Sequence, residues 1–308
     1  MGAGFQSREA YEAAHQYDVT IVGGEGEFVG IAGGYIQGGG HSPMAGIYGL
    51  SSDQFVEVDV VTADGNFLTC SDDQNSDLLW GRDLGHREGL AKDGSMFWDA
   101  MYAFFKYFIP LADAGAYSYL RWYSLSTDIW YFSMTPFWTP NKTVDEHVTL
   151  LRPWLDDLAA LNITLEINAT YYDSFYDAWA EVFPLEEVGY DAGRIASRLF
   201  PRANWDNITL MNETWSAIKN TSENDFVFTA FNMKNELHPE NTANSANPAW
   251  RDSIIHAISA TCWEDGDPVS VMIEDSNSLT YGCMDQWRAV TPGSGAYLGE
   301  VRFAYPEW

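Results

Sequence analysis

The hydrophobic and polar positions of the first 85 residues predict a small α+β segment. This segment is expected to contain a helix at 6–16 and strands at 19–22, 55–61 and 67–70. The last two strands are rich in β-branched residues and are separated by Asp64-Gly65, a dipeptide typical of a tight hairpin turn. A β-hairpin is therefore predicted here.

The remainder predicts an antiparallel sheet covered by helices. Helices are predicted at 97–114, 144–158 and 174–183, and strands at 118–125, 128–134, 163–167 and 226–233, with an ambiguous, strand-like segment at 254–263. Thr143 followed by Glu146 forms a capping-box pattern at the start of the second helix. Residues 81–96 are polar, spaced by glycines and without periodicity, so a linker is predicted there. The predicted fold class is α+β.

Charge narrows the range of partners. The 308 residues include 44 Asp and Glu against 16 Lys and Arg, a formal net charge of −28. Such a chain repels nucleic-acid phosphates and anionic membrane surfaces, so we expect no nucleic-acid and no membrane partner. No apolar run approaches the ~20 residues of a membrane span. Aromatic residues make up 15% of the chain, which is typical either of flat-ring recognition or of an aromatic core.

Several features are typical of a secreted protein. The start lacks the basic and apolar stretches of a signal peptide. Six glycosylation acceptors nevertheless stand at Asn141, Asn162, Asn168, Asn207, Asn212 and Asn220. We therefore expect a glycoprotein of the secretory pathway, with much exposed loop between 141 and 220. Of Cys70, Cys262 and Cys283, the last two form either a disulfide or a pair of buried thiols, and no metal-ligand spacing is present.

The glycine-rich stretch 30–42 is the strongest chemical signal. It holds six glycines in eleven residues and ends in His41-Ser42. Glycines let main-chain N–H groups approach a ligand closely, and a pyrophosphate or a flat ring system fits such a surface. The spacing matches neither the dinucleotide fingerprint nor a phosphate loop. On spacing alone, a flexible surface loop and a structural role for His41 remain open alternatives.

Longer motifs resemble one family. They lie at 29–35, 37–43, 48–50, 53–54, 60–65, 75–80, 247–251 and 291–297. In this order they closely resemble the oxygen-dependent FAD-linked oxidoreductases of the vanillyl-alcohol-oxidase and berberine-bridge-enzyme type, in their fungal secondary-metabolism branch. The resemblance implies a partial PCMH-type FAD-binding domain at 1–85, an aberrant junction at 86–96, a substrate-binding domain at 97–290 and a return segment to the flavin domain at 291–308.

The resemblance also implies a function. It predicts a flavoprotein that oxidises a small-molecule intermediate, possible classes including ergot-type alkaloids, by hydride transfer to FAD with oxygen as acceptor. The residues implied in cofactor contact are Gly33, Gly34, Gly38, Gly39, Gly40 and His41. Tyr297 is implied to face the flavin and substrate and is the candidate catalytic base, with a packed aromatic residue as the alternative.

The chain also departs from the family pattern. Gly26 stands where family members that attach the flavin through two covalent bonds have a cysteine, which predicts non-covalently bound FAD. Gly299 stands where the family branch usually has an asparagine. The resemblance lacks a counterpart for three parts of the family pattern, namely the N-terminal lobe, two strands after Trp80 and the C-terminal segment. The alternative hypothesis is therefore a truncated, inactive remnant that does not bind FAD. A secreted carbohydrate-active protein is a third hypothesis. Asp99, Asp128 and Glu166 are expected to be surface or capping residues rather than catalytic ones.

Overall fold

The computed structural model describes residues 2, 4–54, 57–61, 67–71, 82–83, 87–91, 94–165, 167–185, 193–235, 244, 246–263, 266–297 and 299, with only the backbone described for the strands between 57 and 91. The helices are α1 (Ser7–His15), α2 (Ala45–Tyr48), α3 (Gly94–Phe105), α4 (Phe108–Asp113), α5 (Val144–Ala160), α6 (Phe175–Val182), α7 (Ile208–Glu223), α8 (Ala249–Asp252), α9 (Val269–Asn277) and α10 (Met284–Val290). The strands are β1 (Glu57–Val61), β2 (Phe67–Ser71), β3 (Arg82–Asp83), β4 (Arg87–Ala91), β5 (Tyr117–Ser126), β6 (Ile129–Trp138), β7 (Thr170–Tyr171), β8 (Gly193–Pro201), β9 (Val227–Asn232) and β10 (Ser253–Cys262).

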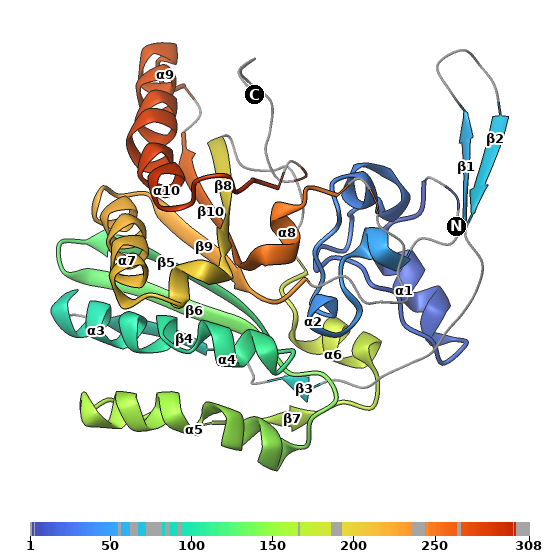
Figure 1. Ribbon diagram of the computed structural model, residues 1–308, viewed down its shortest axis with the longest axis horizontal. Helices are drawn as coiled ribbons and strands as arrows, with labels where there is room; N and C mark the ends of the chain where they lie inside the picture. Colours follow the sequence, from blue (N-terminus) through green and yellow to red (C-terminus); the bar gives the residue numbers. More distant parts are fainter. Residues whose placement is uncertain are drawn as a thin grey trace.

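One antiparallel sheet organises most of the chain (Figure 1). Its order is β7-β3-β6-β5-β9-β10-β8, and β4 pairs with β6 beside β3. The two central registers align Tyr119 with Phe231 and Phe231 with His256. Because side chains alternate between the two faces of a strand, these registers bring three aromatic rings into one row on one face.

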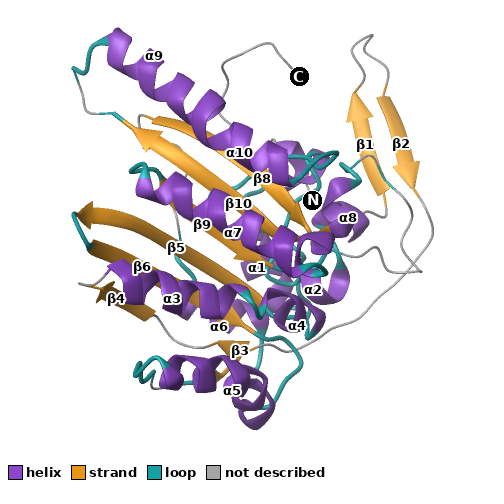
Figure 2. Cartoon of the chain, turned by 60° about the vertical axis from the view of Figure 1, so that its left-hand side comes forward, coloured by secondary structure: helices purple, strands orange, loops and turns teal. Residues whose placement is uncertain are grey.

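Helices cover one face of this sheet, which we call the closed face, defined by Leu120, Trp122, Phe228, Ala257 and Phe200. Its side chains form the main core together with α3, α4, α5, α7 and α10 (Figure 2). The opposite or open face carries Tyr119, Arg121 and Tyr123 of β5 and continues into Phe231 and His256. The N-terminal elements α1 and α2 lie at one end of the open face, next to α6 (Figure 1). The α+β class with a helix-covered antiparallel sheet is thus confirmed.

Local signals explain several boundaries. The capping box at the start of α5 is formed, because Glu146 N–H donates to Thr143 Oγ1 at 3.2 Å and Thr143 N–H donates to the Glu146 carboxylate at 2.6 Å. β1 and β2 pair antiparallel as predicted, while the predicted turn at Asp64-Gly65 lies outside the described residues. The single helix predicted over 97–114 is two helices. Pro110 has no N–H for the carbonyl of Lys106 and its ring would clash with that carbonyl, so the second helix restarts with proline in its first turn.

Three local predictions are wrong. Residues 19–22 and the described part of 163–167 form no strand. Ile163, Leu165 and Ile167 instead pack against the main core, so their alternation reflects burial of one side of an extended loop. The segment 81–96 contains β3 and β4, with Arg87 opposite Met134 and Ala91 opposite Trp130. Backbone pairing at a sheet edge does not require alternating side chains, which is why the polar pattern suggested a linker.

The region from 141 to 220 consists largely of regular structure and not of the exposed loop that was predicted, because it contains α5, α6, β8 and most of α7. The acceptor side chains Asn141, Asn162, Asn168, Asn207 and Asn212 are exposed. Asn220 is partly buried, and its amide donates to Gln286 Oε1 at 2.8 Å. Glycosylation stays a prediction, with Asn220 the least accessible acceptor.

The structure shows the state of two of the three cysteines. Cys262 is an exposed free thiol and Cys283 is a buried free thiol. Burial raises the pKa of Cys283 to about 11. Cys70 lies on β2, of which only the backbone is described.

Candidate functional site

The glycine-rich turn is anchored at its C-terminal half. Ser51 N–H donates to the carbonyl of Gly40 at 2.8 Å, and Ser52 N–H donates to that of Gly39 at 2.9 Å. The Tyr35 hydroxyl donates to the carbonyl of His41 at 2.6 Å. Burial raises the pKa of Tyr35 well above its ordinary value, so this hydroxyl stays protonated and keeps donating. The end of the turn is therefore rigidly placed.

The predicted cofactor glycines fall into two groups. A Cβ at Gly33 or Gly34, which lie in the π-helical turn Ile31–Tyr35, would meet no atom within 4 Å. A Cβ at Gly38 would come within 2.9 Å of the Tyr297 ring, and Gly39 and Gly40 have φ values of +111° and +72°. The first pair therefore presents bare backbone to open space, whereas the second group is required by packing and backbone conformation.

His41 lies in a buried aromatic cluster where the turn meets the sheet. Its ring centroid is 4.8 Å from that of Phe231, 5.0 Å from His256, 5.2 Å from Tyr297 and 5.9 Å from Trp250. The structure thus brings His41 and Tyr297 together although 255 positions separate them in the chain. The indole N–H of Trp250 is buried without an acceptor among the residues that the structure describes. A buried donor of this kind is available to a ligand.

Tyr297 is almost fully buried, at 3% exposure. Its backbone N–H donates to Ser197 Oγ at 3.1 Å, and Ser197 Oγ donates back to its carbonyl at 3.2 Å, so β8 fixes it. A Cβ at residue 299 would lie 2.5 Å from the Tyr297 hydroxyl. The glycine at 299, where relatives were expected to have asparagine, is thus what allows this ring position.

A buried ion pair joins the N-terminal elements to the sheet. Both Nη atoms of Arg251 lie 2.6 Å from the Asp53 carboxylate, which also accepts from Asn244 Nδ2 at 2.6 Å and from Leu50 N–H at 2.8 Å. The Asp53 side chain has no solvent exposure. Since Leu50 and Asp53 flank the residues that hold the turn, this pair fixes the turn relative to α8, which leads directly into β10.

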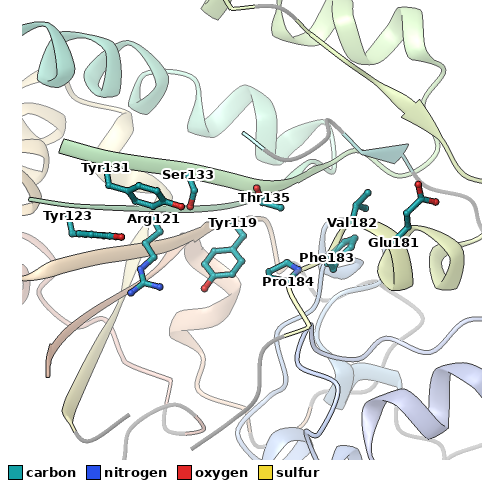
Figure 3. Close-up of a pocket in the computed structure, with 10 residues that line it drawn as sticks. All are labelled: Tyr119, Arg121, Tyr123, Tyr131, Ser133, Thr135, Glu181, Val182, Phe183 and Pro184. Atoms are coloured by element: carbon teal, nitrogen blue, oxygen red, sulfur yellow. The ribbon is translucent and has the colours of Figure 1, made fainter. Parts of the chain in front are cut away.

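A cavity of about 500 Å³ opens on the same face (Figure 3). It is lined by Tyr119, Arg121, Tyr123, Tyr131, Ser133, Thr135, Glu181, Val182, Phe183 and Pro184. β5 and β6 supply hydroxyl groups and one guanidinium, and the end of α6 and the residues after it supply the Glu181 carboxylate and an apolar wall. Such a mixture is typical of a site that holds a small molecule in one orientation.

The cavity and the turn adjoin each other. The Tyr119 ring lies 4.7 Å from Phe231, and Phe231 lies 4.8 Å from His41. A single aromatic side chain therefore separates the cavity wall from the end of the glycine-rich turn. Sequence reasoning missed the cavity residues, although the period-two spacing of Tyr119, Arg121 and Tyr123 on a strand was the signal that could have found them.

Other candidates lie elsewhere. Asp99 and Asp128 are exposed, as expected of surface residues, and Glu166 is outside the described residues. Within the part of the chain that the structure describes, no group of three or more His, Cys, Asp or Glu could hold a metal ion. None of the described helices is long and apolar enough to cross a membrane.

Comparison with known proteins agrees with this geometry. Residues 1–71 match the FAD binding domain family. The chain is 30% identical to FAD-linked oxidoreductase ZEB1 of Gibberella zeae and 31% identical to VAO-type flavoprotein oxidase VAO615 of Thermothelomyces thermophilus, in both cases over all of this chain and 58% of the relative. The crystal structure of VAO-type flavoprotein MtVAO615 from Myceliophthora thermophila superimposes with a TM-score of 0.82 at 25% identity, over 98% of this chain and 59% of that one.

The fold and the FAD binding domain match thus make this chain similar to flavoprotein oxidases of the VAO type. Berberine bridge enzyme from Eschscholzia californica shares the fold, with a TM-score of 0.61 at 11% identity over 94% of this chain and 60% of that one. Over its full length the chain is similar to fungal FAD-linked oxidoreductases, among them one of the VAO type. It spans about 58% of the length of the curated relatives it matches.

Proposed function

We propose that this chain contributes a flavin-contacting turn and a substrate cavity to an oxidase acting on a small molecule of fungal secondary metabolism, for which alkaloids are one candidate class. The observation that carries the proposal is the adjacency of an open glycine backbone, an aromatic cluster and a mixed cavity on one face of the sheet. The domain division at 1–85, 86–96, 97–290 and 291–308 is part of this proposal.

The residues present fit a flavin. Gly33 and Gly34 offer main-chain surface without a side chain, and the Trp250 indole N–H offers a donor that the described residues do not use. His41 and Tyr297 pack against each other and against Trp250 in the aromatic cluster at the end of the turn. Bound FAD would supply a two-electron acceptor that takes a hydride from a substrate carbon and passes the electrons to oxygen. With glycine at position 26, we propose that the cofactor is held non-covalently.

The chain's own residues would bind and orient the substrate. The hydroxyl groups of Tyr131, Ser133 and Thr135 line the β6 side of the cavity and offer hydrogen bonds to a polar substrate end. Phe183 and Pro184 provide the opposite, apolar wall, which favours the hydrocarbon part and excludes water. Tyr297 remains the proposed base, since its hydroxyl belongs to the cluster that joins cavity and turn. Passage through the secretory pathway is proposed from the glycosylation acceptors.

Titration of the purified chain with FAD tests the proposal. Gly34→Leu would project a side chain into the space in front of the turn, so we expect flavin affinity, followed by visible absorbance, to fall at least about tenfold. Gly282→Leu is the matched control, because Gly282 also lies in a π-helical turn with no atom within 4 Å of an added Cβ, yet far along the chain from the site.

Two outcomes would overturn the flavin proposal. The first is a chain that shows no absorbance of bound flavin after titration to saturating FAD, which would favour the inactive-remnant hypothesis. The second is an equal loss of affinity in both glycine variants, which would mean that the turn has no special contact with the flavin. A bound flavin that is bleached by substrate and recoloured by air would support the oxidase directly.

A further inference from the structure

The cavity contains a positive charge placed by strand geometry. Arg121 lies between Tyr119 and Tyr123 on β5, and the register sets it opposite Ser133 of β6. The three β5 side chains extend from the same side of the sheet, with the guanidinium of Arg121 reaching outward beside Tyr119 (Figure 3). Its guanidinium carbon is 5.4 Å from the centre of the Tyr123 ring, which supports it as a cation–π partner.

The guanidinium of Arg121 lacks an anionic partner among the described residues. Four other arginines of this acidic chain are paired with carboxylates, namely Arg251 with Asp53, Arg202 with Asp113, Arg8 with Glu27 and Arg288 with Asp285. Arg152 is exposed on α5 without an ion pair among the described residues, but it lies outside the cavity. Arg121 is exposed at the cavity and forms neither an ion pair nor a hydrogen bond with any residue the structure describes. The other charged side chain that lines the cavity is Glu181 at the end of α6, and no ion pair joins it to Arg121, so the guanidinium is available to an anionic ligand.

The surroundings of Arg121 favour a carboxylate as the missing partner. A guanidinium binds a planar carboxylate through two parallel N–H···O bonds, and the nearby hydroxyl of Ser133 can donate a further bond. The net charge of −28 repels free anions in general. A carboxylate ligand therefore binds only if the rest of the ligand also makes favourable contacts with the cavity. Val182, Phe183 and Pro184 offer such contacts to an apolar body.

We propose that the cavity takes a substrate with a carboxylate group on an apolar, ring-bearing body, and that Arg121 binds the carboxylate. The inference rests on the proposed function in that it names the substrate class of the same site. Arg121 is a substrate-binding residue in this arrangement, and no electron or proton passes through it. The tyrosine rings beside it stack against the apolar body and orient it along the row that leads to Phe231 and His41.

Binding of a matched pair of probes tests the proposal. The acid 3-phenylpropionate and the neutral alcohol 3-phenylpropan-1-ol differ only in the group that Arg121 would recognise. We expect the acid to bind the unaltered chain more tightly than the alcohol in calorimetric or ligand-observed NMR titrations. Arg121→Gln should weaken binding of the acid about tenfold or more and change binding of the alcohol less than about twofold.

Two further variants keep the test decisive. Arg152→Gln removes an exposed arginine on α5, outside the cavity, and should leave both affinities unchanged. Arg121→Lys retains the charge without the planar guanidinium. Its affinity for the acid should lie between those of the unaltered chain and of Arg121→Gln, with a stronger dependence on salt concentration. Circular dichroism checks that each variant keeps the fold. Equal binding of acid and alcohol, no binding of the acid, or an acid affinity unaffected by Arg121→Gln would overturn the proposal.

Flavin absorbance measured on the same samples separates the two proposals. Flavin bound, with acid binding indifferent to Arg121, overturns the carboxylate site alone. Acid binding that depends on Arg121, in a chain that takes up no flavin, overturns the flavin site and leaves the carboxylate site standing.

Discussion

The two faces of the sheet are built by the same strands but differ in what completes them. On the closed face, Leu120 and Phe200 are fully buried beneath helices of the same chain. On the open face, one step along β5, Arg121 and Tyr123 remain accessible and line a cavity. The side chains of the closed face are buried by helices of the same chain and contribute to stability. The open face leaves polar side chains accessible to a ligand. This difference predicts where substitutions unfold the protein and where they alter only binding.

The largest effect is expected on the closed face. Trp287 has no exposure, its ring centre lies 5.4 Å from that of Phe200, and its N–H donates to Thr221 Oγ1 at 2.9 Å. Trp287→Ala should lower the free energy of unfolding by about 3–5 kcal/mol in urea titrations. The same measurement on Tyr123→Ala, a half-exposed residue of the open face, should give about 1 kcal/mol or less. Comparable losses would mean that the two faces do not differ as described.

The junction between the turn and the sheet should be nearly as sensitive. Asp53→Asn leaves Arg251 without its carboxylate in a largely buried position and should cost about 3 kcal/mol. Because the ion pair lies beside the turn, flavin affinity should fall together with stability. Asp252→Asn changes an exposed neighbour of Arg251 and serves as the control for both urea titration and flavin binding. An unchanged midpoint for Asp53→Asn would show that the turn is held by other contacts.

A smaller effect distinguishes the two groups of glycines. Gly40→Ala forces a side chain into a left-handed backbone position and within 2.8 Å of Ser51 Cβ, so it should destabilise the fold by about 1–3 kcal/mol. Gly34→Ala meets no neighbour and should change the unfolding free energy by less than about 0.5 kcal/mol. Thermal unfolding of both variants measures this. A Gly34→Ala protein as unstable as Gly40→Ala would contradict the division of the turn.

The smallest effect is a pH dependence away from both faces. The hydrogen bond from Arg202 lowers the pKa of Asp113 in the folded protein, with nearby positive charge adding to it and desolvation opposing it. The ion pair therefore contributes stability above the ordinary pKa near 4, and the contribution is lost as the pH falls through the lowered value. Asp113→Asn should cost less than about 1 kcal/mol at pH 7, because the pair is solvent-exposed, and nothing at pH 2. A cost that persists at pH 2 would exclude the ion pair as its cause.

Local signals allowed part of the fold to be predicted. The Thr143–Glu146 capping box acts within a few residues, and the Asp64-Gly65 dipeptide separates two short strand patterns, so the sequence alone identified α5 and the antiparallel pair β1 and β2. β8 and α7 were missed, since β8 begins at Gly193 and carries two charged arginines, and α7 has polar residues in nearly every turn. Their formation depends on partners that are distant in the chain, namely β10 for β8 and the closed face for α7.

The site shows the same limit. The glycine-rich turn was recognisable because its composition is unusual over one short stretch. Its separation into open and packed glycines depends on Tyr297, Trp250 and Ser51, which only folding brings near. The cavity was not predicted because it combines β5, β6 and the end of α6, and a single arginine on a strand gives no signal until the opposite wall is known.

The construction of the cavity from a helix end and two strands has a consequence for how such a protein diversifies. α6 is tied to the N-terminal elements by the Trp179 N–H, which donates to the carbonyl of Glu25 at 2.9 Å, while the residues just after it form the apolar wall. Phe183 is itself buried, and its ring packs against those of Trp138 and Phe175. A substitution in this segment therefore reshapes the cavity and the aromatic packing behind it at the same time, so the shape of the cavity and the stability of this part of the fold are coupled.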